Sequence, residues 1–207
     1  INIMCGIIIS SLEIPKKAYK YVENRGPDLI NKITYNNINF VHFLLHLTGE
    51  KTGQPIIEDN IVCIFNGEIY NYKSLFQEAK SDIYSIIYCY KKYGEDFVKH
   101  LDGEFVIILF DFKENKLIIT SDIFKTKPLF YNINKEIVIS SYESSCKKIK
   151  DGNYNKLNAN EMLVFSLNKE NGNRKLIKKK KIHEFDLTQK KDNYNDYIKA
   201  FENAVLK

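Results

Sequence analysis

A cysteine stands near the start of the chain, directly after Met4. If Cys5 became the N-terminal residue, its thiol would be a nucleophile and its own α-amine a base. Residues 1–3 (Ile-Asn-Ile) precede Met4. Three interpretations stay open. In the first, Met4 is the true start, and the three residues before it come from upstream translation or were added. In the second, a propeptide is removed before Cys5, and in the third, Cys5 stays blocked and the site is inactive.

The stretch Asn66-Gly67-Glu68 offers a second chemistry. Asn-Gly is a strong signal for a β-hairpin turn, and this is the simpler interpretation. Alternatively, the side-chain N–H of Asn66 and the backbone N–H of Gly67 converge on one oxygen and form an oxyanion hole. In that case the carboxylate of Glu68 would face an ammonium group.

Two further polar positions have both a structural and a functional interpretation. Ser81 and Asp82 precede a helical pattern, so one of them would cap the helix and the other is free to point elsewhere. Arg25 lies in the stretch RGPD and is one of only two arginines in the chain. It would recognise a carboxylate or clamp its own loop through backbone carbonyls.

The elements that must position these residues are mostly strands. Apolar residues at 83, 86, 87 and 90 predict a helix that ends at Gly94. The run 105–110 is apolar on both faces, which indicates a strand covered on both sides. We also expect a helix over 14–24, and a strand over 60–65 that is followed by a turn at Asn66-Gly67. This pattern predicts an α+β fold with two stacked sheets and helices outside.

Composition narrows the classes of function. The 207 residues carry a net charge of +5, and no apolar run approaches the ~20 residues that span a bilayer. None of the cysteines at 5, 63, 89 and 146 forms a CxxC pair, which favours a reducing, cytoplasmic setting. The basic run 174–181 would bind nucleic acid or form a solvated strand end and linker, and the second interpretation is favoured because a lone run carries no base readout.

Seven stretches, taken in order, carry a family resemblance. They are MCGI (4–7), RGPD (25–28), the segment 42–55, FNGEIYNY (65–72), SD (81–82), LDGEFVIILFD (101–111) and KPLFY (127–131). Together they resemble the class II glutamine amidotransferases, most of all the N-terminal glutaminase domain of asparagine synthetases. The resemblance implies an Ntn-hydrolase fold, a four-layer αββα sandwich, over residues 4–186.

The resemblance also implies a reaction, the hydrolysis of glutamine to glutamate and ammonia. Cys5 would be the nucleophile, and Asn66 and Gly67 would stabilise the oxyanion. The substrate-binding residues that we expect are Arg25, Leu45, Leu47, Thr48, Asn66, Gly67, Glu68 and Asp82. No metal or organic cofactor is expected for this half of the reaction.

A second domain is part of the same expectation. In such proteins ammonia passes to a synthetase domain, and ATP and Mg²⁺ belong only to that domain. We expect residues 187–207 to be a linker and the first helix of a missing synthetase domain, so that the chain is a fragment. The expected partners are glutamine and a synthetase domain, with a homodimer as a further assembly and no nucleic acid or membrane.

One position departs from the family pattern His-x-Arg-Leu-Ser. When that pattern is placed on His42 and Leu45, Leu44 stands at the position of the arginine that pairs with the substrate carboxylate. Arg25 or Lys51 would have to supply the cation. The departure leaves two hypotheses: an active glutaminase domain, which the other site residues favour, and a non-catalytic structural or docking module that has lost glutamine binding.

Overall fold

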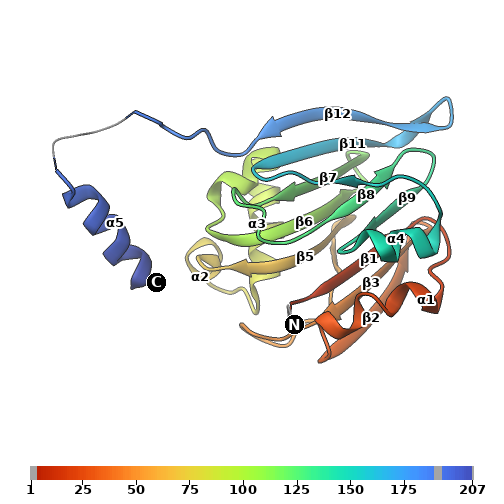
Figure 1. Cartoon of the computed structure of the whole chain (residues 1–207), viewed down its shortest axis with the longest axis horizontal. Helices are drawn as coiled ribbons and strands as arrows, with labels where there is room; N and C mark the ends of the chain where they lie inside the picture. Colours follow the sequence, from red (N-terminus) through yellow and green to blue (C-terminus); the bar gives the residue numbers. More distant parts are fainter. Residues whose placement is uncertain (1–3, 189–192, 207) are drawn as a thin grey trace.

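Two antiparallel sheets of six strands each form the centre of the protein (Figure 1). The computed structural model describes residues 4–188 and 193–206. The first sheet has the order β10 (Asn155–Lys156), β8 (Phe130–Ile133), β9 (Ile137–Ser140), β1 (Gly6–Ser10), β3 (Ile38–Leu44) and β2 (Leu29–Tyr35). The second has the order β12 (Asn173–Lys181), β11 (Glu161–Glu170), β7 (Lys116–Ser121), β6 (Gly103–Asp111), β5 (Ile61–Ile69) and β4 (Ile56–Glu58).

The two sheets pack face to face across an apolar core. Ile7 and Phe40 of the first sheet lie in one buried cluster with Ile64 and Ile108 of the second. Successive side chains of a strand point to opposite faces, so Ile107 lies in a different cluster on the outer face of β6. Strand β6 is therefore covered on both sides, as the apolar run 105–110 predicts.

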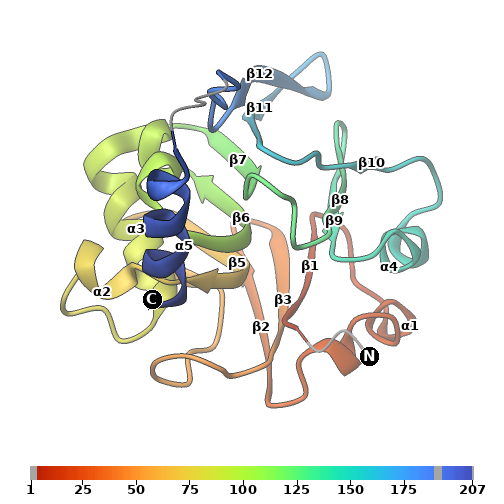
Figure 2. The same ribbon diagram turned by 60° about the vertical axis from the view of Figure 1, so that its left-hand side comes forward.

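Helices cover both outer faces (Figure 2). The helices α1 (Lys16–Tyr19) and α4 (Glu143–Ile149) lie over the first sheet, where Ala18 and Ile149 pack with Phe43. On the other side, α3 (Asp82–Tyr93) and the 3₁₀ helix η2 (Gly94–His100) cover the second sheet, and the short α2 (Tyr72–Leu75) precedes them. The expected αββα sandwich is confirmed.

The helix expected over 14–24 is wrong. The chain forms only the four residues of α1 and a 3₁₀ turn, η1 (Glu23–Arg25). The N–H of Val22 donates to the carbonyl of Tyr19, and the N–H of Arg25 donates to the carbonyl of Val22. Residues three apart share one face in such tight turns, so Val22 and Arg25 are both buried.

The turn expected at Asn66-Gly67 is also wrong. Strand β5 continues through both residues and pairs them with Val106 and Phe105 of β6. The tight turn lies earlier, at Asp59 and Asn60, which both have positive φ (51° and 64°) between β4 and β5. Two such residues are what a two-residue hairpin turn requires.

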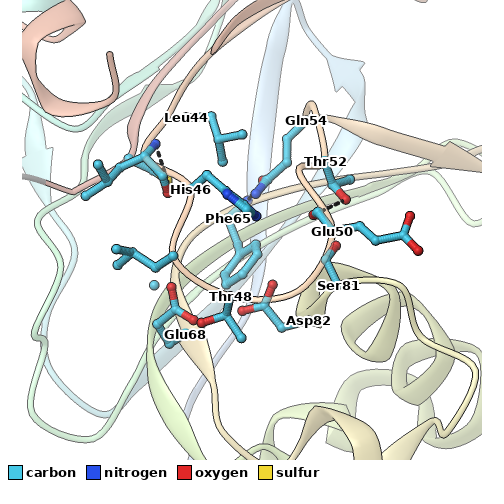
Figure 3. A pocket seen from close by; sticks show the side chains of 14 residues that line it. Leu44, His46, Thr48, Glu50, Thr52, Gln54, Phe65, Glu68, Ser81 and Asp82 are labelled. Carbon is cyan, nitrogen blue, oxygen red and sulfur yellow. Dashed lines mark hydrogen bonds between the residues drawn. The ribbon is translucent and has the colours of Figure 1, made fainter. Parts of the chain in front are cut away.

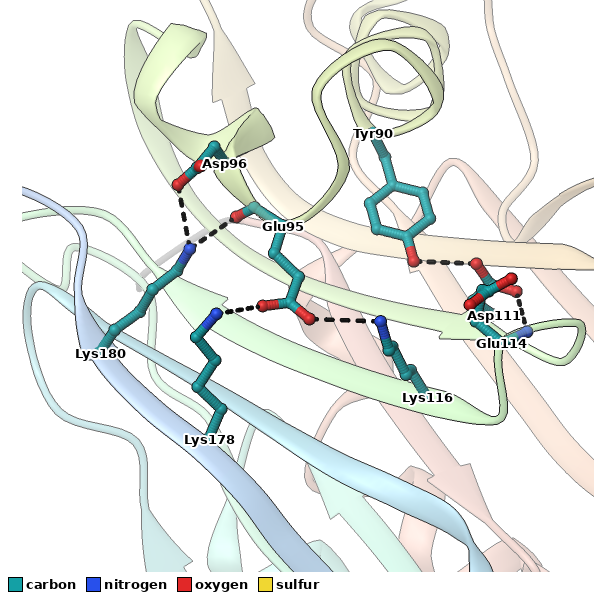
Figure 4. Close-up of polar contacts among 8 residues, drawn as sticks. All are labelled: Tyr90, Glu95, Asp96, Asp111, Glu114, Lys116, Lys178 and Lys180. Atoms are coloured by element: carbon teal, nitrogen blue, oxygen red, sulfur yellow. Dashed lines mark hydrogen bonds and ion pairs between the residues drawn. The ribbon is translucent and has the colours of Figure 1, made fainter.

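The basic run 174–181 lies entirely within strand β12, so the expected linker is not part of it, and two of its lysines pair with acidic side chains of the second outer layer (Figure 4). Glu95 Oε2 lies 2.8 Å from Lys178 Nζ, and Asp96 Oδ1 lies 3.1 Å from Lys180 Nζ. These pairs hold the sheet edge against η2, which supports a strand interpretation of the run. Within the described residues, no helix is long and apolar enough to cross a bilayer.

The helical spacing near the C-terminus is confirmed by α5 (Asn195–Val205). Its apolar side chains at Tyr197, Phe201 and Val205 lie four residues apart and are all exposed. The helix therefore presents an uncovered apolar stripe. Part of the connection, residues 189–192, lies outside the described residues, and the division at 186/187 stays a prediction.

Candidate active site

Two adjacent cavities lie where the start of β1, the end of β3 and the second half of β5 meet. Five of the expected site residues line both cavities: Cys5, Leu45, Leu47, Gly67 and Glu68. Asn66 lines one of the cavities, and Thr48 and Asp82 line the other (Figure 3). The structure therefore brings together every expected site residue except Arg25.

Cys5 sits against the backbone that follows β3. Its Sγ lies 3.4 Å from the Leu45 nitrogen, which donates to it, and 3.5 Å from the Leu45 carbonyl oxygen. Burial raises the pKa of the Cys5 thiol to about 11. The thiol is therefore protonated at neutral pH, and attack by its sulfur needs a base that removes the proton.

The side-chain amide of Asn66 is a buried donor that the described residues leave unused. The residue is 1% exposed, and its Nδ2 has no hydrogen-bond partner within the described part of the chain. An unpaired buried N–H is costly, and such groups are rare in folded proteins. Its position on the wall of a cavity beside Cys5 leaves this donor available to a ligand oxygen.

The backbone N–H groups of Phe65, Gly67 and Ile69 lie along the side of β5 that faces away from β6, beyond the end of β4. The N–H of Phe65 donates to Gln54 Oε1 at 2.7 Å, and the N–H of Ile69 donates to Asp82 Oδ2 at 3.1 Å. Alternate residues of a strand point their N–H groups to the same side, so the Gly67 N–H lies between these two. Because Gly67 lines both cavities, its N–H is a second donor beside Asn66.

Gly67→Ala is expected to destabilise the protein by about 3 kcal/mol, because a Cβ there would lie 1.9 Å from the carbonyl oxygen of Glu104. Gly152→Ala is a matched control, since Gly152 has a similar φ (+144° against +143°) but open space around it. The control should cost about 1 kcal/mol of backbone strain. Urea unfolding of both variants measures the difference, and equal losses would contradict the close approach of β6 at Gly67.

Asp82 reaches back from the start of α3 to the second half of β5. The residue is 7% exposed, and its carboxylate accepts the hydrogen bond from the N–H of Ile69. Burial, reinforced by the charge of Glu68, raises the pKa of Asp82 to about 7. Ser81 is the N-cap residue but does not cap the helix through its side chain, since its hydroxyl is buried and has no partner among the described residues.

Asp82→Asn is expected to raise the free energy of unfolding by about 1–3 kcal/mol at pH 8. The pKa of Asp82 is higher in the folded state than its ordinary value of 3.8, so folding binds a proton between these two pH values. Wild-type stability should therefore fall, relative to the variant, as the pH rises from about 4 through about 7. Urea titrations at pH 4, 6 and 8 test this, and a variant that is less stable at pH 8 would contradict it.

Arg25 is placed differently from the other site residues. Its Nε donates to the carbonyl oxygen of Cys5 at 2.9 Å, and its Nη1 donates to the hydroxyl of Tyr142 at 2.6 Å. The side chain is buried and does not line either cavity, and neither does the exposed Lys51. Arg25 therefore binds a backbone carbonyl, as the clamp interpretation predicts. The carbonyl belongs to Cys5, however, and not to the loop of Arg25 itself.

Leu44 is the last residue of β3 and lines the same cavity as Glu68 and Asp82. The cavity also has members that sequence reasoning missed. Gln54 is one of them, and its buried side chain also accepts the hydrogen bond from the Phe65 N–H of β5. The two residues are eleven positions apart, and no local sequence pattern predicts a contact over that separation.

Taken together, the site offers a thiol, the unpaired side-chain N–H of Asn66, the backbone N–H of Gly67 and two carboxylates around adjoining cavities. Donors beside a nucleophile suit a reaction in which negative charge develops on an oxygen. The carboxylates of Glu68 and Asp82 suit a positively charged group on the same substrate. Among the described residues, no group of three or more metal-ligating side chains is placed to hold a metal ion.

Comparison with curated proteins points to one group of enzymes. A probable glutamine-hydrolysing asparagine synthetase of Dictyostelium discoideum is 31% identical over 173 residues, which cover 73% of this chain and 31% of that protein. Asparagine synthetase 1 of Saccharomyces cerevisiae is 33% identical over 138 residues, which cover 58% of this chain and 24% of that protein. The chain thus spans less than a third of the length of these relatives.

Solved structures share the fold at low identity. A glutamine phosphoribosylpyrophosphate amidotransferase from Bacillus subtilis superposes with a TM-score of 0.53 at 16% identity, covering 86% of this chain and 43% of that one. This similarity shows the Ntn-hydrolase arrangement of two stacked antiparallel sheets between helices. The family described as "Glutamine amidotransferase domain" matches residues 4–192, and the chain belongs to this family.

Proposed function

We propose that this domain hydrolyses the side-chain amide of glutamine to glutamate and ammonia, with Cys5 as the nucleophile. One observation supports it most: Cys5 shares a cavity with Asn66, whose buried side-chain N–H has no partner among the described residues. A donor left unused beside a thiol is what a developing oxyanion needs. In a domain that binds no ligand oxygen there, the protein would be more stable if this amide had a hydrogen-bond partner in the protein or were replaced by an apolar side chain.

The first step requires Cys5 to be the N-terminal residue. Cys5 is joined to Met4, whose N–H donates to the Arg25 carbonyl at 3.0 Å, so the peptide bond between Met4 and Cys5 must be cut. The freed α-amine then takes the thiol proton, directly or through a water molecule. An α-amino group has an ordinary pKa near ~8, which makes it a usable base at neutral pH.

The sulfur attacks the amide carbon, and the oxygen becomes an oxyanion between Asn66 Nδ2 and the Gly67 N–H. When the carbon–nitrogen bond breaks, the nitrogen takes the proton held by the α-amine and leaves as ammonia. A γ-glutamyl thioester remains on Cys5. Water then attacks the thioester carbon, glutamate leaves, and the thiol is restored.

Glu68 and Asp82 hold the α-ammonium of the substrate in this proposal. Leu45, Leu47 and Thr48 also line this cavity. The chemistry requires no metal and no organic cofactor. Arg25 acts as a positioning residue here, because it fixes the carbonyl of Cys5 through its Nε.

We further propose that the ammonia passes to a synthetase domain that begins after residue 186. The relatives that support this carry the name asparagine synthetase and are more than three times as long as the matched region. ATP and Mg²⁺ would act only in that domain. Helix α5 would then be the first helix of that domain, and its exposed apolar stripe would pack against the rest of it.

A second candidate is a non-catalytic docking module of the same fold. Leu44 favours it, because the cavity that Leu44 lines with Cys5, Glu68 and Asp82 has no arginine or lysine among its lining residues to pair with the carboxylate of glutamine. A module of this kind would keep the fold and lose hydrolysis.

The test is the release of ¹⁵N-ammonium from glutamine labelled at the side-chain amide. The chain is produced with Met4 as the initiator, and its mass is used to select protein that begins at Cys5. Ammonium release that depends on Cys5 supports the glutaminase. Its absence from protein with a free Cys5 would favour the docking module.

A further inference from the structure

The cavity beside Cys5 has an unusual balance of charge for a site that would bind an amino acid. Glu50, Glu68 and Asp82 line it, and its lining includes no lysine or arginine. In Figure 3 the side chains of Glu68 and Asp82 lie at the end of the cavity opposite Leu44. A free carboxylate entering this space would meet like charges and no cation.

The nearby cations are held elsewhere. Lys127 lines the second cavity, but its Nζ lies 2.7 Å from Glu104 Oε1 in an ion pair. The Arg25 guanidinium donates to Cys5 and to Tyr142 outside the cavities. Lys127 would have to break its ion pair to bind a substrate carboxylate. Arg25 has one nitrogen, Nη2, without a partner among the described residues, but its side chain is buried and lines neither cavity.

An ammonium group, in contrast, finds three acceptors. Glu68 and Asp82 each offer carboxylate oxygens, and Ser81 lines the same cavity with a hydroxyl that is buried (4% exposed) and has no partner among the described residues. An ammonium carries three N–H donors, so these three side chains match its number of hydrogen bonds. The unpaired hydroxyl of Ser81 is an observation independent of the acidic charge.

We propose that this site recognises glutamine through its ammonium group alone and prefers glutamine whose carboxyl group is neutral, as at the N-terminus of a peptide. This inference rests on the proposed amide hydrolysis at Cys5. Leu44 takes the place of a carboxylate-binding cation and leaves an apolar surface that tolerates an uncharged amide. Glu68, Asp82 and Ser81 supply the binding energy for the ammonium.

Three probes separate the two charged groups of glutamine. L-glutamine N-methylamide keeps the ammonium and has no carboxylate, glutaramate keeps a carboxylate and has no ammonium, and L-glutamine has both. Release of side-chain ammonia gives kcat/KM for each probe. We expect the N-methylamide to exceed glutamine by about 10-fold and glutaramate to fall below glutamine by about 100-fold.

Charge variants test the cause of this preference. Leu44→Arg should move the ratio of kcat/KM toward glutamine by about 100-fold, because it restores a cation for the carboxylate. Leu44 is buried (7% exposed), so Thr48→Lys, at an exposed lining position, is a second variant that should shift the ratio in the same direction. Ile177→Arg, on the exposed face of β12, adds the same charge far from the cavity and should leave the ratio unchanged.

Binding to the full chain carrying Cys5→Ala separates this inference from the proposed reaction. Calorimetric titration measures the affinity for each probe, and tighter binding of the N-methylamide than of glutamine supports the inference. This holds even if the wild-type protein hydrolyses no probe, because only the proposed reaction then fails. Tighter binding of glutamine, or of glutaramate, overturns the inference. Hydrolysis of glutamine in that case would still support the proposed reaction.

Discussion

Cys5→Ala is expected to lower the rate of glutamine hydrolysis by about 10⁴-fold or more, since no other group near the cavity can form the thioester. The other cysteines at 63, 89 and 146 are fully buried and line neither cavity. The measurement is kcat from ammonia release with protein whose mass shows the expected first residue. The free energy of unfolding should change little, because the Cys5 thiol makes only weak contacts with the backbone of Leu45.

Two variants control for this result. Cys89→Ala removes a thiol that is 0% exposed and packs behind β5, so it should lower stability and leave kcat unchanged. Cys5→Ser keeps a hydroxyl in place of the thiol and should retain no more than a trace of activity. Activity close to wild type in Cys5→Ala would show that the nucleophile is another group.

Asn66→Ala is expected to lower kcat by about 10²–10³-fold, the effect of removing one donor from an oxyanion hole. KM should change far less, because Nδ2 is proposed to act on charge that develops only in the transition state. Stability should not fall by the cost of a lost hydrogen bond, since this amide nitrogen has no partner among the described residues. Steady-state kinetics and urea unfolding, measured together, give both quantities.

Asn71 provides a matched control of the same residue type. Its Nδ2 donates to the His100 carbonyl and its Oδ1 accepts the Asp102 N–H, so both ends of this amide hold the end of η2 and the loop after it to the turn after β5. Asn71→Ala should cost about 1–2 kcal/mol of stability and leave kcat unchanged. If Asn66→Ala instead lost stability and kept its kcat, Asn66 would be a structural residue.

The layered fold could be predicted because its signals are local. The apolar run 105–110 requires cover on both faces, and the structure provides it from two clusters. The spacing 83, 86, 87 and 90 defines one face of α3, and these residues are all buried. Such patterns depend only on the period of a strand or a helix.

The path of the chain at Asn66-Gly67 could not be predicted in this way. The dipeptide has the composition of a turn, but Gly67 is needed because the Glu104 carbonyl of the neighbouring strand leaves no room for a Cβ. The hydrogen bonds that anchor this half of β5 come from Gln54 and Asp82, which belong to other elements. Tertiary contacts therefore override the local preference.

The position of Arg25 depends on an even more distant partner. Its guanidinium donates to the hydroxyl of Tyr142, 117 residues away, and its Cζ atom lies 5.0 Å from the centre of that ring. The sequence leaves the carboxylate and the clamp interpretations equally open, because it does not show which groups surround the side chain. The α-helical expectation for 14–24 failed for a related reason, since Arg25 is turned inward by a 3₁₀ turn.

The proposed nucleophile can be tested most directly by intact mass before and after treatment with a diazoketone analogue of glutamine, which alkylates an activated thiol. Protein expressed from Met4 should begin at Cys5 and gain one adduct on Cys5, and the Cys5→Ala variant should gain none. An unlabelled protein with a free Cys5, or an adduct on Cys63, Cys89 or Cys146, would contradict the assignment of Cys5 as the nucleophile.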